Sequence, residues 1–155
     1  MVNKELLRSV DFFEDFSDEM LERLAKMADL REYQKGEYLN RRRRSADNLY
    51  IILHGAISLE TENMEGEIVR LETLVDGAAL GFSSLIDIEP RQYLSDARVI
   101  TPTRVLRFRA DDILSLCYQD LQFGFLIMKK IALIAKQRLL YRTQPLDKIS
   151  DRKAK

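Results

Sequence analysis

The chain has 155 residues, and 25 Lys+Arg balance 25 Asp+Glu, so the formal net charge at pH 7 is +0. This length fits one domain of about 150 residues, and the absence of a basic excess argues against a dedicated nucleic-acid binder. The one cysteine, Cys117, excludes a disulfide framework, a four-cysteine zinc site and a cysteine-bound iron–sulfur cluster, and the one histidine, His54, excludes most histidine-based metal sites. The composition predicts a soluble, cytoplasmic, single-domain protein over 1–155 with no bound metal.

The first segment, 3–30, has the periodicity of helices. Its apolar residues recur at spacings of three and four, which places them on one buried face. They are Met20, Leu21, Leu24, Met27 and Ala28. Ser17 precedes this run and is a good helix cap, and Asp18 and Glu19 follow it in the first turn, where acidic side chains are favourable. We expect helices here, one of them starting at Ser17.

From 31 to 109 the sequence changes to short runs in which β-branched and aromatic residues alternate with polar ones. The predicted strands are 31–34, 37–40, 48–53, 56–61, 67–74, 79–80, 94–100 and 103–109. The predicted turns are Lys35-Gly36, His54-Gly55, Glu65-Gly66, Asp76-Gly77 and Thr101-Pro102. Several short strands about ten residues apart predict a β-sandwich, roll or barrel.

The last segment, 111–143, returns to the helical period. Asp111 and Asp112 are expected to cap a short helix. Asp120 then begins a longer helix that ends ahead of Pro145, because proline does not fit a helix interior.

The long helix carries two apolar stripes. One follows alternating steps of four and three, the a/d seam of a coiled coil. Its residues are Leu121, Phe125, Met128, Ala132, Ala135 and Leu139. The second stripe consists of Ile127, Ile131, Ile134 and Tyr141. Both stripes are buried if one packs on the β-core and the other on the same helix of a second copy, which predicts a homodimer through the seam. The alternative is a single wide stripe buried within its own domain.

The order of these elements, together with several short motifs, resembles the cyclic nucleotide-binding domain. The similar motifs are Leu6-Leu7, Phe12-Phe13, Ser17 to Leu21, Leu24-Ala25, Gly36-Glu37, Ala46 to Ile57, Asp76-Gly77 and Leu80-Gly81. The residues similar to the paired helices of the catabolite activator and Fnr branch are Asp111, Leu114, Leu133, Ala135, Arg138 and Leu139. The resemblance implies a mainly β fold with flanking helices: a β-roll of jelly-roll type over 31–109, N-terminal helices over 3–30, and C-terminal helices over 111–143 that include a long dimerisation helix.

The resemblance also implies a ligand pocket, the phosphate-binding cassette, at Gly81. In that family a glutamate directly after the glycine accepts the ribose 2′-hydroxyl, and an arginine shortly before the next strand pairs with the phosphate. Here Phe82 stands at the glutamate position and Tyr93 at the arginine position, with Arg91 two residues earlier. The small hydroxyl residues after the glycine keep the anion-binding character of a helix start. The candidate ligand contacts are Gly81, Phe82, Ser83, Ser84, Arg91, Tyr93 and Ser95.

A cassette of this kind predicts a non-catalytic regulatory or ligand-sensing domain that does not bind cyclic AMP or cyclic GMP in the usual way. No cofactor is expected beyond a cyclic nucleotide or another small anionic ligand. One alternative is a structural dimerisation or docking module whose pocket is filled by its own Phe82 and Tyr93. Another is a cyclic nucleotide sensor in which Arg91 supplies the missing charge. An enzyme is not expected, because the sequence holds no nucleophile–base pair, metal cluster or phosphate-binding glycine loop.

The expected partners are a second copy of the chain and another protein. A membrane partner is not expected, because the longest apolar stretch, 123–134, is interrupted by Lys129 and Lys130, whereas a spanning helix needs ~20 largely apolar residues. The chain by itself is not expected to read DNA as that branch does, since it shows no recognition helix after the long helix.

Three further features have a structural and a functional interpretation. The arginine run 41–44 fits a solvated turn better than an anion or nucleic-acid contact. His54 fits an exposed turn better than a haem ligand. Cys117 fits a small buried hydrophobic residue better than a redox centre.

Overall fold

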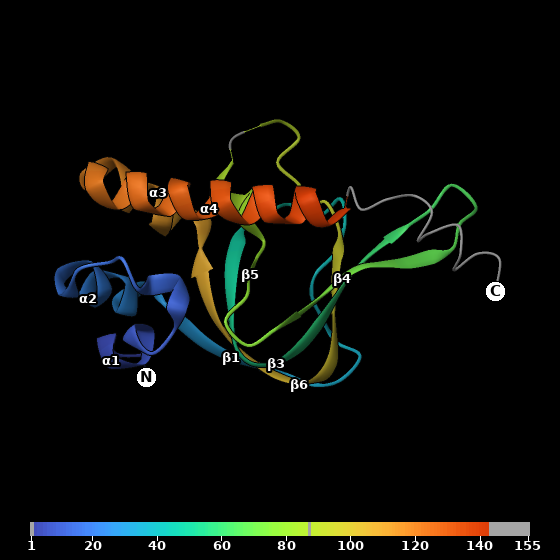
Figure 1. The fold of residues 1–155 in the computed structure, drawn as a ribbon, viewed down its shortest axis with the longest axis horizontal. Helices are drawn as coiled ribbons and strands as arrows, with labels where there is room; N and C mark the ends of the chain where they lie inside the picture. The colour runs from blue at the N-terminus through green and yellow to red at the C-terminus, as the bar shows by residue number, and fades with distance from the viewer. Residues whose placement is uncertain (1, 87, 143–155) are drawn as a thin grey trace.

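A computed structural model describes residues 2–86 and 88–142 of the chain. The N-terminal elements are α1 (Lys4–Arg8), η1 (Asp11–Phe13) and α2 (Asp18–Met27). The strands are β1 (Asp29–Tyr33), β2 (Tyr38–Asn40), β3 (Asn48–Glu62), β4 (Ile68–Val75), β5 (Ala79–Leu80) and β6 (Asp96–Arg109), and the short helix η2 (Phe82–Leu85) precedes β6. The chain continues with α3 (Ala110–Gln119) and α4 (Leu121–Arg142). The predicted fold class, a mainly antiparallel β fold with flanking helices and a long C-terminal helix, is confirmed (Figure 1).

The N-terminal helical segment is broken into short pieces and ends earlier than predicted. Strand β1 begins at Asp29, inside the range expected to be helical. The cap at Ser17 is confirmed, because its Oγ accepts a hydrogen bond from the Met20 N–H at 3.2 Å. Phe12 and Phe13 lie in the single turn η1 and are both buried. Burial of both rings favours this turn over a longer helix.

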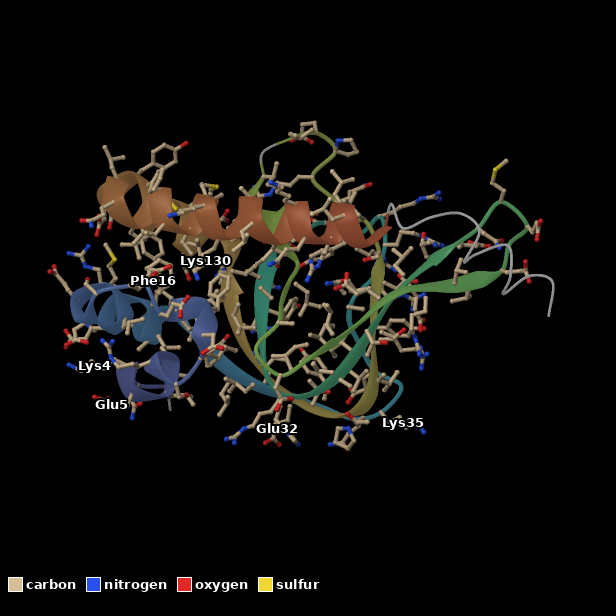
Figure 2. The ribbon with its side chains drawn as sticks, viewed as in Figure 1. Lys4, Glu5, Phe16, Glu32, Lys35 and Lys130 are labelled. Carbon is tan, nitrogen blue, oxygen red and sulfur yellow. The ribbon has the colours of Figure 1, made fainter. Side chains whose placement is uncertain are left out.

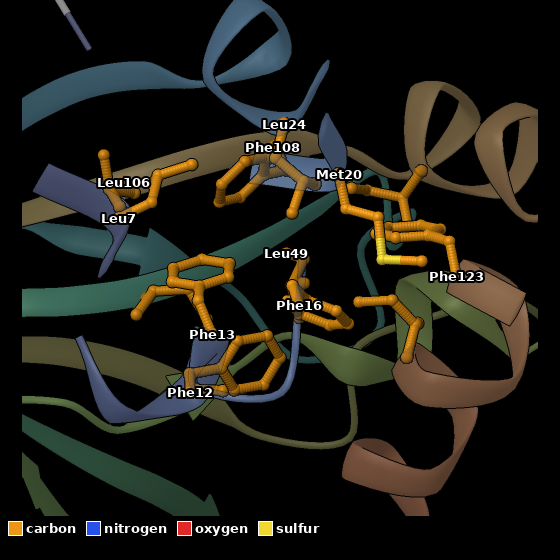
Figure 3. Close-up of a cluster of buried hydrophobic side chains, with 14 of the residues drawn as sticks. Leu7, Phe12, Phe13, Phe16, Met20, Leu24, Leu49, Leu106, Phe108 and Phe123 are labelled. Atoms are coloured by element: carbon orange, nitrogen blue, oxygen red, sulfur yellow. The ribbon is translucent and has the colours of Figure 1, made fainter. Parts of the chain in front are cut away.

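A cluster of aromatic and aliphatic side chains joins the N-terminal helices to the β-roll and to α4 (Figure 3). The Phe13 ring centroid lies 6.1 Å from that of Phe108 on β6 and 6.0 Å from that of Phe16. The Phe16 centroid lies 5.5 Å from that of Phe123 on α4. Aromatic pairs at these distances add to the hydrophobic burial, so the helices pack on the roll as one core.

The sheet contains two long strands where the sequence predicted four short ones. The strand order is β1-β6-β3-β4, with β2 on β6 and β5 on β3. The turns predicted at His54-Gly55 and Thr101-Pro102 are wrong, since β3 and β6 pass through these positions. The register between the two strands shifts on both sides of Gly55, and Pro102, which lacks the N–H for a ladder bond, is not paired with a residue of β3. The turn residues bend the strands instead of ending them.

At Gly55 the bent strands come close together. Its φ is +126°, and a Cβ built there would lie 2.7 Å from the Thr103 Cα, a backbone atom. The Thr103 hydroxyl accepts a hydrogen bond from the Ala56 N–H at 3.2 Å. The close approach requires glycine at this position.

A polar cluster crosses the buried part of β3 and its two neighbours. The Glu60 carboxylate accepts hydrogen bonds from the Arg98 guanidinium at 2.7 and 3.0 Å and from the Ser58 hydroxyl at 2.6 Å. Arg70 Nε donates to the Ser58 hydroxyl at 2.8 Å. The hydrogen bonds from Arg98, more than any other contact, hold the pKa of Glu60 below its usual range, against the opposing cost of burial.

Glu60→Gln is expected to lower the free energy of unfolding by about 2 kcal/mol at pH 7. Because the folded-state pKa of Glu60 is depressed, its contribution is present above the unfolded pKa and is lost as the pH falls through the folded pKa. Urea unfolding at a series of pH values therefore measures a difference between wild type and variant that shrinks under acid conditions. Glu62→Gln is the matched control on the same strand, since Glu62 is half exposed in its pair with Arg42 and exposed pairs contribute at most about 1 kcal/mol. A pH-independent loss in Glu60→Gln would contradict this account.

The helices α3 and α4 form a tight pair. Asp120 caps α4, as predicted, by accepting a hydrogen bond from the Phe123 N–H at 3.1 Å. The cap of α3 is Arg109 rather than the predicted Asp111 and Asp112, which lie in its first turn. Cys117 is partly buried against α4, and burial raises the pKa of its thiol, in keeping with a packing role.

The two stripes of α4 differ in burial, and the seam is exposed at Leu121 and Phe125 but partly buried at Ala135. Ile127 and Ile131 of the second stripe are buried in the core. The side chain of Tyr141, in the same stripe, and the predicted helix end at 143 lie outside the described part of the chain. Lys130 points from α4 toward the N-terminal helices and forms ion pairs with Glu14 and Asp15 (Figure 2). No helix within 2–86 and 88–142 is long and apolar enough to span a membrane.

Candidate ligand-binding site

A cavity of about 220 Å³ lies between the segment that joins β5 to η2, the segment that precedes β6, and α4. Its lining consists of Asn40, Leu59, Leu80, Gly81, Phe82, Ser83, Tyr93, Leu94, Ser95, Ala135, Arg138 and Leu139. Five of the seven predicted ligand contacts line it, and Ser84 and Arg91 do not. Residues from distant parts of the chain meet here because α4 lies across the β-roll (Figure 1).

Gly81 is required by the backbone at the cavity wall. Its φ is +80°, and a Cβ there would lie 2.6 Å from the Asn48 carbonyl oxygen. The following helix, η2, has only four residues, and its Ser84 N–H already donates to the Gly81 carbonyl. The helix whose start was predicted to bind an anion is therefore only a short turn. Ser84 is fully buried outside the cavity, and its Oγ has no hydrogen-bond partner in the described part of the chain.

Tyr93 occupies the position where the resemblance places an arginine, and its hydroxyl is directed at the backbone of β3. It accepts a hydrogen bond from the Asn48 N–H and donates one to the Asn48 carbonyl, both at 3.0 Å. Burial is the main cause that raises the pKa of Tyr93, so the hydroxyl stays protonated near neutral pH. Tyr93 thus fixes the cassette segment to β3 and presents an aromatic wall to the cavity.

Arg91 does not line this cavity. Its Nη2 lies 3.8 Å from Asp111 Oδ1 on α3. It lines a separate polar hollow together with Arg107 and Arg109. Arg91 also lines a hollow with Phe82 and Ser83, so it lies near the cassette while its guanidinium pairs with α3.

Arg138 on α4 is the one charged residue that lines the cavity among the described residues, and it was not among the predicted ligand contacts. It is buried, and its Nη2 donates a hydrogen bond to the Ala79 carbonyl. Its Nε lies 3.6 Å from Glu72 Oε1 on β4, and its guanidinium lies 5.3 Å from the centroid of the Phe82 ring. The sequence signal was present, because Arg138 follows Ile134 by four residues and so continues the inner stripe of the helix.

His54 and the arginine run, for which the sequence allowed a structural and a functional interpretation, form contacts with neighbouring acidic side chains. His54 is exposed, and its Nδ1 lies 3.4 Å from Asp76 Oδ2 across a turn. Arg41 Nε donates to the Asp96 carboxylate at 3.2 Å, and Arg42 pairs with Glu62 at 3.0 Å. No group of three or more His, Cys, Asp or Glu that could hold a metal occurs among the described residues.

Comparison with known proteins identifies relatives of this fold. A model of the family "Cyclic nucleotide-binding domain" matches residues 30–120, more than half of the chain. A protein from Geobacter metallireducens, named as cyclic nucleotide-binding, is 28% identical with a TM-score of 0.78, and the match covers 90% of this chain and 99% of that one. A cyclic nucleotide-binding-like protein from Brucella abortus is 30% identical with a TM-score of 0.60, over 75% of this chain and 97% of that one. The sensor domain of the transcriptional regulator DNR from Pseudomonas aeruginosa shares the fold, with 22% identity, a TM-score of 0.71 and coverage of 88% of this chain and 90% of that one.

Proposed function

Because this chain belongs to the cyclic nucleotide-binding domain family, a family of regulatory and sensor domains, we propose that it is a non-catalytic ligand-sensing domain with a non-standard cassette. The cavity beside Gly81 is its ligand site. The ligand is not cyclic AMP or cyclic GMP held in the usual way, because Phe82 cannot accept a ribose hydroxyl and the Tyr93 hydroxyl is engaged with Asn48. An unmatched polar group on a bound ligand costs about 1–3 kcal/mol.

One observation carries this proposal: α4 forms a wall of the cavity. Ala135 and Arg138 line the cavity from the same helix whose outer face bears the apolar seam. A ligand that contacts one helix in one of two arrangements biases the equilibrium between them by its differential affinity. Occupancy is thereby transmitted to α4 without any further relay.

The outer seam of α4 is the proposed dimer interface. Leu121 is 76% exposed and Phe125 is 66% exposed, which is unusual for large apolar side chains in a regular pattern. The small, exposed Ala132 allows two helices to approach closely within the seam, whereas Ala135 and Leu139 of the predicted seam also line the cavity. A second copy buries the seam by presenting the same residues, as a two-fold interface requires.

A structural docking or dimerisation module is the second candidate. It is favoured by the side chains that occupy the roll, since Tyr93 and Arg138 both direct polar groups to backbone carbonyls there. In that case the cavity has no ligand, and α4 acts only as an assembly helix. A thermal-shift titration with cyclic AMP and cyclic GMP, where wild type is expected to show no saturable shift, tests the third alternative, a sensor that uses Arg91.

The sensing proposal is tested by filling the cavity. Ser95→Trp is expected to change hydrogen exchange of the backbone amides over 132–140, because an indole in the cavity contacts α4 as a ligand would. Ser115→Trp is the matched control, since Ser115 is exposed on α3 and does not line the cavity. Exchange in α4 that is the same in both variants and in wild type would favour the docking module over the sensor.

A further inference from the structure

Arg138 is a buried charged residue in the wall of the ligand cavity. It is 9% exposed, and it lies between two cavities, the ligand cavity beside Gly81 and a second one of about 470 Å³ under α4. It is the one charged residue among those that line the ligand cavity within the described chain. A cationic group in apolar surroundings favours a nearby anion more strongly than the same group in water does.

We infer that the ligand of this cavity is a small organic anion with an apolar body, and that Arg138 binds its carboxylate or phosphate group. This inference rests on the proposed sensing function and specifies its ligand. The apolar body is indicated by the lining, which includes Leu80, Phe82, Leu94 and Leu139. The small size follows from the volume of about 220 Å³, which is below the roughly 300–1,000 Å³ of pockets for drug-sized ligands.

The pair between Arg138 and Glu72 is a loose one. Arg138 Nε lies 3.6 Å from Glu72 Oε1, which is longer than the roughly 2.7–2.9 Å of a charge-assisted hydrogen bond. Glu72 Oε1 is itself buried with no hydrogen-bond partner in the described residues. A guanidinium has five N–H donors in a planar fork that matches an anion with two oxygens. Glu72 is therefore an internal competitor, and the anion takes its place at Arg138.

The exchange links the ligand to α4 directly. Arg138 bonds the Ala79 carbonyl on β5 and pairs with Glu72 on β4, so it fastens α4 to two strands. An anion that draws the guanidinium toward the ligand cavity weakens the pair with Glu72 at the opposite cavity. Because the Glu72 carboxylate competes for Arg138, it sets the affinity that an anion needs before the arrangement of α4 changes.

The test uses benzoate, octanoate and phenyl phosphate as probes, with benzamide and octanamide as neutral counterparts. Thermal shifts of the full chain are measured against probe concentration in the millimolar range. At least one anion is expected to stabilise wild type in a saturable way, and its neutral counterpart is not. Arg138→Gln is expected to weaken that anion by about tenfold or more, because hydrogen bonds to a charged group are lost.

Glu72→Gln gives the opposite and more specific result. It removes the competitor and a like charge, so the same anion is expected to bind several-fold more tightly than to wild type. This arm remains decisive if Arg138→Gln does not fold. Lys136→Gln removes one positive charge from an exposed position of the same helix and is expected to leave the affinity unchanged.

Three outcomes would overturn the inference. One is that none of the anions binds wild type or Glu72→Gln. The second is equal binding of an anion and its neutral counterpart, which would leave the sensing function in place with a different ligand class. The third is equal loss in Arg138→Gln and Lys136→Gln, which would show a general effect of charge. The cavity-filling experiment with Ser95→Trp is independent of all three, so failure of the sensing function is recognised separately.

Discussion

Gly55→Ala is expected to reduce the free energy of unfolding by about 2–6 kcal/mol, a large effect for a single methyl group. The new Cβ would lie 2.7 Å from the Thr103 Cα and 2.3 Å from its hydroxyl oxygen. A backbone atom cannot move without disturbing the pairing of β3 with β6. Two costs add, about 1–3 kcal/mol for a non-glycine residue at φ +126° and about 1–3 kcal/mol for overpacking.

Gly36→Ala separates these two costs. Gly36 also has a positive φ, +92°, but nothing lies within 4 Å of a Cβ built there. It is expected to show only the conformational cost, about 1–2 kcal/mol. Chemical denaturation of both variants measures the difference. Equal losses in the two variants would show that the strands do not meet as closely at Gly55 as the structure has them.

Phe125→Glu is expected to convert the chain from dimer to monomer at micromolar concentration, with a dissociation constant raised by about 100-fold or more. An unpaired carboxylate within an apolar seam costs several kcal/mol, and each 1.4 kcal/mol changes the dissociation constant tenfold. Light scattering or sedimentation of wild type is expected to give twice the monomer mass of 18.1 kDa. Because Phe125 is 66% exposed in the single chain, the substitution should leave the folded monomer intact.

Val75→Glu makes the same chemical change away from the seam. Val75 is 55% exposed on β4, so the variant is expected to remain dimeric. Met128→Glu, one step along the seam, should behave like Phe125→Glu. A monomeric wild type, or dimers that survive in both seam variants, would exclude the seam as the interface.

Part of the candidate site could be predicted from the sequence because its signals are local. Gly81, which has a positive φ, and the aromatic residues at the two cassette positions could be identified from neighbouring residues in the chain and from the resemblance. Five predicted contacts line the cavity for this reason. Arg91 was expected near the cavity on chain distance alone, but its side chain pairs with Asp111 on α3, which no local pattern encodes.

Arg138 is the clearest residue whose contacts the sequence could not predict, although the helical spacing places it on the inner stripe of α4. An arginine on a helix is usually solvated, and only the position of α4 across the roll brings it to Ala79 and Glu72, more than fifty residues earlier in the chain. The same holds for Tyr93, whose hydroxyl partner is the backbone of Asn48. Both contacts exist only once the strands and α4 have assembled.

The sequence by itself determined the order of the helices and strands, the caps at Ser17 and Asp120, and the two stripes of α4, because each follows from periodicity or from hydrogen bonds within a few residues. Only the tertiary structure decided that the expected turns at His54-Gly55 and Thr101-Pro102 are bends within β3 and β6. It also decided that a cation from α4, rather than one from the cassette, enters the cavity. The physical reason is the same in both cases: pairing partners and pocket walls come from distant segments, and their positions are set by the packing of the whole core.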